Sequence, residues 1–114
     1  MMQIQIQATG IGLNDPLISH VQRRLRYALS RSDDRVSRVT VRLSDINGPK
    51  GGVDKACRIE VRLAGRPSVV IEDIQSDLYT AVDRAAGRAG RTVLRRLALP
   101  LARRRAAVVG QLQP

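Results

Sequence analysis

The sequence has very few aromatic residues and a single cysteine. Its 114 residues include no Phe and no Trp, and the aromatic residues are Tyr27 and Tyr79. Because Cys57 is alone, it cannot form an internal disulfide, which favours a cytoplasmic protein. The core must be built from Leu, Ile, Val and Ala. A protein that reads single-stranded RNA by stacking its bases is disfavoured.

Long apolar runs are also absent. No stretch approaches the roughly 18 apolar residues that a membrane-spanning helix requires. The start, MMQIQIQATG, alternates polar and apolar residues without a basic region, so it does not resemble a signal peptide. We therefore expect a cytoplasmic protein with one small domain over residues 1–99, followed by a basic, flexible tail over 100–114.

Acidic residues are scarce relative to basic ones. The 10 Asp and Glu face 20 Lys and Arg, which gives a formal net charge of +10 and a pI near 11.5. After Asp83 no acidic residue follows, whereas eight arginines do. Such a chain attracts polyanions, and the clustering of its charge favours nucleic acid.

Hydrophobic periodicity predicts the order of the elements. The alternating, strand-like segments are residues 2–8, 36–45, 57–63 and 68–72. Helical spacing of apolar residues follows Asp15 and Ser76, which we expect to cap two helices, and Pro100 ends the second. The order β-α-β-β-β-α predicts a two-layer α+β domain, with both helices packed on one face of a four-stranded sheet.

The last predicted helix carries a stripe of arginines opposite its apolar side. The stripe consists of Arg84, Arg88, Arg91 and Arg95. Their spacing of four, three and four residues projects them from one side of a helix. Glycine in a helix interior costs about 1 kcal/mol relative to alanine. We therefore expect Gly87 and Gly90 to allow a close approach to the sheet or the first helix, which would place two basic faces side by side.

Two segments and an arginine-rich first helix carry a resemblance to a known family. The segments are MQIQIQATGIGLNDPL and EDIQSDLYTAVDRAAGRAGRTVLRR. The chain resembles the ribosome hibernation-promoting factors, also called ribosome-associated inhibitors or sigma-54 modulation proteins, over about residues 2–97. In that family the last helix opens with an acidic residue, an apolar residue and Tyr, then Ala, an aliphatic residue and Asp. The matching residues here are Asp77, Leu78, Tyr79, Ala81, Val82 and Asp83.

The resemblance implies a protein that binds the small ribosomal subunit in its decoding region, between head and body. Such a protein inhibits translation by occupying the place of mRNA and tRNA, as a monomer off the ribosome. We expect no cofactor, metal or small-molecule substrate. The expected RNA-binding residues are Arg23, Arg24, Tyr27, Arg31, Arg84, Arg88, Arg91, Arg95 and Arg96. Tyr27 stands where the family commonly has a second Lys, so a stacking or hydrogen-bonding contact would replace a charge.

The length resembles that of a short family member, without the second domain that pairs two ribosomes in long ones. Whether its basic tail, with Arg103 to Arg105, promotes or prevents ribosome dimerisation stays open.

A double-stranded-RNA-binding domain is the alternative, because its α-β-β-β-α order is contained in this one. Such domains place basic residues at the start of the second helix, whereas here Asp77 and Asp83 stand there. A module that binds a membrane surface is a less favoured alternative, since docking on a sheet already explains the amphipathic helices.

An enzyme is also disfavoured. His20 is the only histidine, and Cys57 alternates with buried strand residues, which is typical of a core position. The acidic pairs at 33–34 and 72–73 are expected at the ends of elements, where turns and helix starts favour carboxylates. No nucleophile, base and acid can be brought together from these residues by sequence alone.

Two further features of the sequence can each be interpreted in two ways. Outward strand positions carry Arg38, Arg42, Arg58 and Arg62, which form a second basic surface or keep the open sheet face soluble. The flexible connection over 47–54 contacts RNA or is simply a hairpin turn.

Overall fold

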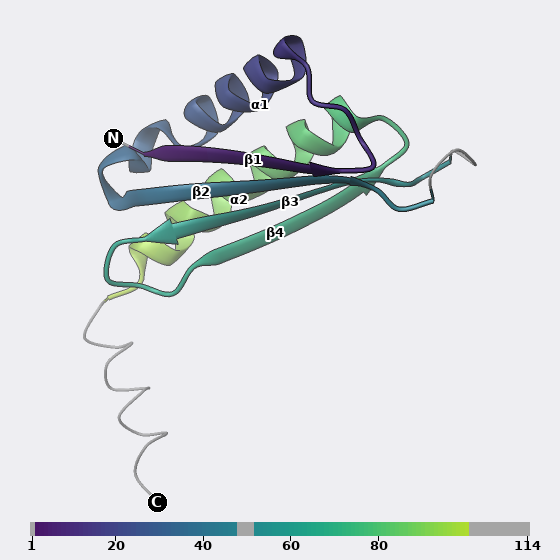
Figure 1. Ribbon diagram of the computed structural model, residues 1–114. Coiled ribbons are helices and arrows are strands. Elements are labelled where there is room, and N and C mark those ends of the chain that lie inside the picture. Colours follow the sequence, from purple (N-terminus) through teal and green to yellow (C-terminus); the bar gives the residue numbers. More distant parts are fainter. Residues whose placement is uncertain (1, 48–51, 101–114) are drawn as a thin grey trace, which may run out of the picture.

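The protein was analysed as a computed structural model, which describes residues 2–47 and 52–100 (Figure 1). The elements are β1 (Gln3–Thr9), α1 (Asp15–Ala28), a 3-10 helix η1 (Ser30–Arg35), β2 (Val36–Asp45), β3 (Lys55–Leu63), β4 (Val69–Gln75) and α2 (Leu78–Ala98). The predicted order β-α-β-β-β-α is confirmed, and the structure adds η1 between α1 and β2. The division into a domain and a tail stays a prediction, because residues 101–114 lie outside the described part.

The four strands form one sheet in the order β1-β2-β3-β4. β1 runs parallel to β2, β2 runs antiparallel to β3, and β3 runs antiparallel to β4. In Figure 1 α2 passes behind the strands and α1 lies above β1. Both helices share one core with alternate strand residues, and the strand residues between those are mostly exposed within the described part of the chain. The predicted two-layer α+β architecture is therefore confirmed.

The helix caps differ from prediction by one residue. Asn14, not Asp15, caps α1, since its side chain accepts a hydrogen bond from the Leu17 amide at 2.9 Å. Asp77, not Ser76, caps α2 and accepts from the Thr80 amide at 2.9 Å. In both cases the cap is the last residue with an extended backbone, from which a short side chain reaches the free amides of the first turn.

β4 is longer than predicted, and this changes the position of one carboxylate. The strand continues to Gln75 instead of ending near residue 72, so Asp73 lies within it and not at an element end. Its side chain shares the helix-facing side with Val69 and Ile71 and is only 8% exposed. An inward carboxylate is tolerated in a strand when a basic partner reaches it, and α2 supplies that partner.

The core between the layers is aliphatic, as expected from the composition. Its largest fully buried side chains are Leu25, Leu29, Leu43, Ile59, Val21, Val39, Val41, Val61, Val69, Val82 and Val93. Cys57 is fully buried among them, which confirms its core position. Burial, with a smaller contribution from the charge of Asp73, raises the pKa of the Cys57 thiol to about 12. The thiol is therefore neutral at physiological pH and unsuited to nucleophilic catalysis.

The connection predicted over 47–54 is anchored at its end. Asp54 is fully buried, and the Lys55 ammonium lies 2.9 Å from its carboxylate and 3.1 Å from that of Asp45. These hydrogen bonds raise the pKa of Lys55. Asp54 is thus part of the folded domain, because a buried carboxylate is held by its ion pair. The residues between, 48–51, lie outside the described part.

α2 approaches α1 closely at one glycine. A Cβ atom on Gly90 would lie against the carbonyl oxygen of Ala28 and 3.1 Å from its carbonyl carbon. At Gly87 the nearest atoms to such a Cβ are guanidinium nitrogens, of Arg91 at 3.4 Å and of Arg24 at 3.9 Å. The expected close approach is therefore found at Gly90 and does not require glycine at position 87.

Candidate nucleic-acid interface

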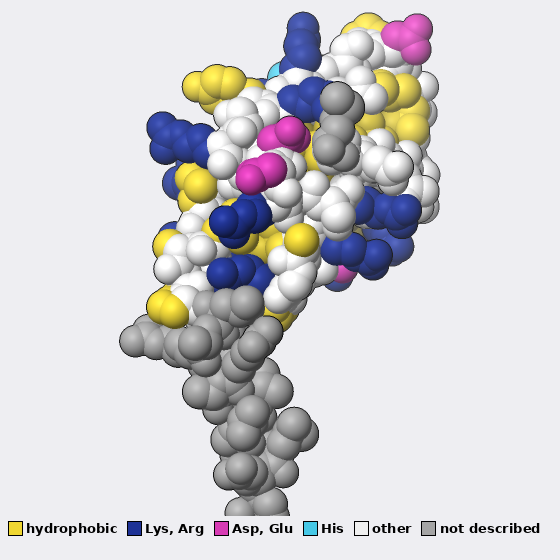
Figure 2. Space-filling view, turned by 90° about the vertical axis from the view of Figure 1, so that its left-hand side faces the viewer, with side chains coloured by type: hydrophobic (Ala, Val, Ile, Leu, Met, Phe, Trp, Pro, Cys, Tyr) yellow, Lys and Arg dark blue, Asp and Glu magenta, His cyan; other side chains and the backbone are white. Residues whose placement is uncertain are grey.

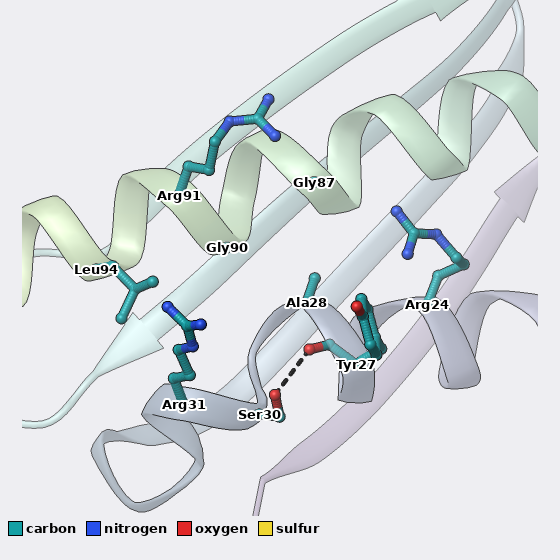
Figure 3. Close-up of a pocket in the computed structure, with 9 residues that line it drawn as sticks. All are labelled: Arg24, Tyr27, Ala28, Ser30, Arg31, Gly87, Gly90, Arg91 and Leu94. Carbon is teal, nitrogen blue, oxygen red and sulfur yellow. Dashed lines mark hydrogen bonds between the residues drawn. The ribbon is translucent and has the colours of Figure 1, made fainter.

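α1 and α2 enclose a groove on the outer side of the helix layer. Its volume is about 520 Å³, and its charged lining residues are Arg24 from α1, Arg31 from η1 and Arg91 from α2. The other residues that line it are Tyr27, Ala28, Ser30, Gly87, Gly90 and Leu94. In Figure 3 the guanidinium groups of Arg24 and Arg31 point toward α2. Among the residues that the structure describes, no carboxylate lines this groove, so all of its charged lining residues are basic.

Gly87 forms part of the floor between two of these arginines. Guanidinium nitrogens of Arg24 and Arg91 both lie within 4 Å of the position that its Cβ would occupy. Two cations from different helices are thus held near each other, over a residue without a side chain. Guanidinium groups in this arrangement can donate forked hydrogen bonds to one anion from two directions.

Tyr27 stands beside this groove with its ring in solvent. The residue is 76% exposed, far more than a core aromatic would be. Its ring offers a flat surface on which a base could stack, in place of the charge that the resemblance leads one to expect.

Arg24 is oriented by Asp83 of α2. Its Nε donates to the Asp83 carboxylate at 3.1 Å and its Nη2 to the Asp83 carbonyl oxygen at 3.1 Å. The same carboxylate oxygen lies 2.7 Å from Nε2 of His20, whose ring packs edge-on against Tyr79 at 4.8 Å. Asp83 therefore joins α1 to α2 and partly neutralises Arg24. The sole histidine belongs to this helix–helix contact.

Half of the predicted arginine stripe is partly neutralised by the sheet. Arg84 and Arg88 lie 3.6 Å and 3.4 Å from the carboxylate of Asp73, and Arg88 also donates to the Glu72 carbonyl oxygen at 3.0 Å. Sequence reasoning missed this contact because it placed Asp73 at the end of a strand. The alternation of Val69, Ile71 and Asp73 was the available signal, since an inward Asp requires a basic neighbour.

The remaining predicted RNA-binding residues differ in the contacts that they make. Arg95 donates to the Thr92 hydroxyl at 3.3 Å, and Arg96 is half-buried near the end of α2. Within residues 2–47 and 52–100, no ion pair involves Arg23, Arg31 or Arg91. The structure thus gathers Arg24, Tyr27, Arg31 and Arg91 around one groove and leaves the other predicted residues outside its lining.

Arg66 is a structurally important arginine that the sequence did not reveal. From the turn between β3 and β4, it donates to the carbonyl oxygens of Arg96 and Leu99 at 2.9 Å and 2.8 Å. It satisfies carbonyl groups that the end of a helix leaves free and places positive charge at the negative end of the helix dipole. The terminal turn of α2, with Arg95 and Arg96, is thereby held in place.

The described residues contain no cluster of three or more His, Cys, Asp or Glu able to hold a metal ion. Among the helices of the same part of the chain, none is both long and apolar enough to cross a membrane.

Comparison with known proteins places this chain in a family. The family of sigma 54 modulation proteins and S30EA ribosomal proteins matches residues 4–98. The chain belongs to this family. The resemblance inferred from the sequence is thus confirmed, and the family is one of ribosome-associated factors and not of enzymes.

Solved structures agree with this membership. The N-terminal domain of Protein Y from Thermus thermophilus is 26% identical, with a TM-score of 0.68, over 83% of this chain and 98% of that one. A ribosomal subunit interface protein from Coxiella burnetii has the same fold, with a TM-score of 0.73 at 20% identity, over 87% of this chain and 100% of that one. No curated protein sequence matches the chain.

Proposed function

We propose that this protein binds the small ribosomal subunit in its decoding region and inhibits translation by occupying the place of mRNA and tRNA. The observation that carries the proposal is the groove in which Arg24, Arg31 and Arg91 meet without a carboxylate in the lining. Guanidinium groups stay charged at physiological pH and bind phosphate through paired hydrogen bonds. Release of condensed counterions from the RNA adds to the affinity.

Within this groove, Arg31 and Arg91 are the foremost phosphate ligands, because neither is engaged by a carboxylate of the described residues. Arg24 contributes from a position held by Asp83. Arg84 and Arg88 contribute less, since their charge is shared with Asp73. Recognition of this kind follows the shape and backbone of folded RNA and not its sequence.

The family supports the ribosome as the partner, and the structural relative from Coxiella burnetii is named a ribosomal subunit interface protein. The protein acts as a monomer, by occupancy and without chemistry.

Co-sedimentation with separated small and large subunits tests the proposal. We expect saturable binding to the small subunit near one copy each, and strong loss in the double variant Arg31→Gln/Arg91→Gln. Arg26→Gln/Arg35→Gln is the matched control, because it removes the same charge from exposed positions that do not line the groove. The control should bind like the unaltered protein.

Competition then locates the site. Pre-bound mRNA and initiator tRNA should exclude the protein from small subunits, and the protein should inhibit cell-free translation. Equal binding to both subunits and to plain duplex RNA, without competition, would favour the double-stranded-RNA-binding alternative and contradict the decoding-site proposal.

A further inference from the structure

The open face of the sheet carries a second set of arginines, on the side opposite the helix groove. Arg38, Arg42, Arg58 and Arg62 are all exposed there. In the β2–β3 register, Arg38 lies directly opposite Arg62, and Arg42 directly opposite Arg58. The view in Figure 2, from the left-hand side of Figure 1, shows basic side chains on both sides of the domain.

This arrangement is unfavourable for the isolated domain. Side chains directly opposite on antiparallel strands have Cβ atoms about 5 Å apart, and like charges there destabilise the sheet. Among the described residues, no ion pair relieves either arginine pair. On the helix side, by contrast, Asp73 and Asp83 hold Arg84, Arg88 and Arg24.

Carboxylates do occur on this face but do not cancel its charge. Glu60 lies opposite Thr40, in the row between the two arginine pairs, and Glu72 lies opposite Arg58 on β4. Neither glutamate forms an ion pair within the described part of the chain. The arginines therefore outnumber the acids, and each pair presents two guanidinium groups to solvent.

The side chains of the face suit a phosphate better than a stacked base. One shallow depression, of about 130 Å³, is lined by Thr40, Arg42, Arg58 and Glu60. Another, of about 440 Å³, is lined by Gln3, Val36, Ser37, Arg38 and Arg62. The face has no aromatic side chain for stacking, since the only Tyr residues lie on the helices. Along a strand the two arginine pairs stand about 13 Å apart, so each pair can meet a separate phosphate.

We propose that the open sheet face is a second RNA-binding surface, on which Arg38 with Arg62, and Arg42 with Arg58, each bind a phosphate of the RNA backbone. Bound phosphate neutralises charges that repel each other in the free protein. The domain then contacts RNA on two opposite sides, with the helix groove on one and the sheet on the other. This inference rests on the proposed function only for the identity of the RNA.

The test is the salt dependence of binding, measured with a short RNA duplex and with isolated small subunits. The variants are Arg42→Gln/Arg58→Gln and Arg38→Gln/Arg62→Gln, beside the charge-matched control Arg26→Gln/Arg35→Gln. Because each arginine pair binds one phosphate, each sheet variant should lower the slope of log Kobs against log salt by about 1 and weaken binding about tenfold near 50 mM salt. The control variant should show smaller changes in both the salt slope and the affinity.

Thermal unfolding separates loss of binding from loss of fold. Because the sheet variants remove like-charge pairs, their midpoints should equal or exceed that of the unaltered protein. Unchanged salt slopes in the sheet variants, or losses equal to those of the control, would overturn the inference.

The two proposals can fail separately. If the sheet variants bind like the unaltered protein while Arg31→Gln/Arg91→Gln loses the small subunit, the second surface is refuted and the helix groove stands. If the protein binds both ribosomal subunits equally, the decoding-site proposal fails. If the sheet variants then still show a smaller salt slope on duplex RNA, the sheet surface stands.

Discussion

Gly90 of α2 lies directly against the backbone carbonyl of Ala28, at the end of α1. This contact sets the distance between the two helices, and therefore the width of the groove in which Arg24, Arg31 and Arg91 meet. A side chain at position 90 would have to displace backbone atoms and not a flexible side-chain end.

Substitution of Gly90 should therefore destabilise the domain although it improves helix propensity. We expect Gly90→Ala to lower the free energy of unfolding by about 1–3 kcal/mol, because overpacking forces the helices apart. Gly87→Ala is the matched control, and it should raise that free energy by up to about 1 kcal/mol through helix propensity, since only mobile guanidinium groups face it. Urea unfolding of both variants measures this, and equal effects would contradict the role of Gly90.

Asp73 should restrain RNA binding while it stabilises the fold. Asp73→Asn removes a carboxylate shared by Arg84 and Arg88, so we expect a loss of about 1–2 kcal/mol in unfolding free energy. Binding to duplex RNA should become tighter and more dependent on salt, because two guanidinium groups are released. Asp33→Asn gives the same change in net charge at an exposed position. Affinity gains of equal size in the two variants would show that net charge alone acts.

The cap of α2 should make stability dependent on pH in acid. Hydrogen bonds from the Thr80 amide and hydroxyl lower the pKa of Asp77 below its ordinary value of 3.8. A lowered pKa in the folded state contributes stability above pH 3.8, and that contribution is lost as the pH falls through the folded-state pKa.

Asp77→Ala should accordingly be less stable than the unaltered protein at neutral pH, with the difference shrinking below pH 3.8. Asp77→Asn keeps an oxygen that can cap, so it should retain stability at neutral pH and lack this acid-dependent loss. Thermal unfolding followed by circular dichroism at several pH values measures both. A constant difference between Asp77→Ala and the unaltered protein down to about pH 2 would contradict the assignment.

Cys57 should be chemically silent in the folded protein. Because burial raises its pKa to about 12, little thiolate exists at neutral pH. We expect alkylation by iodoacetamide to be slow in buffer and fast in guanidinium chloride, as followed by mass spectrometry. A Ser30→Cys variant, with a thiol at an exposed position, supplies the positive control. Fast alkylation of Cys57 in the native protein would contradict its burial.

The elements of the fold could be predicted because their signals are local. The alternation within residues 36–45 matches β2 (Val36–Asp45), and the apolar stripe of α2 is buried as expected at Val82, Ala85 and Val93. Errors occurred at the ends: the cap of α1 lies one residue before the predicted one, the cap of α2 lies one residue after it, and β4 continues past residue 72 to Gln75. Periodicity predicts the type of an element, but its last residue depends on neighbours that are distant in sequence.

The sequence by itself determined the charge of this protein, the order of its helices and strands, the aliphatic character of its core and the helix faces that carry arginine. Only the tertiary structure decided which arginines are held by carboxylates and which are free. Asp73 and Asp83 reach their partners from other elements, Gly90 meets Ala28 across 62 residues, and the β2–β3 register sets Arg42 opposite Arg58. Such pairings arise when the helices pack on the sheet, and no periodicity within a single segment encodes them.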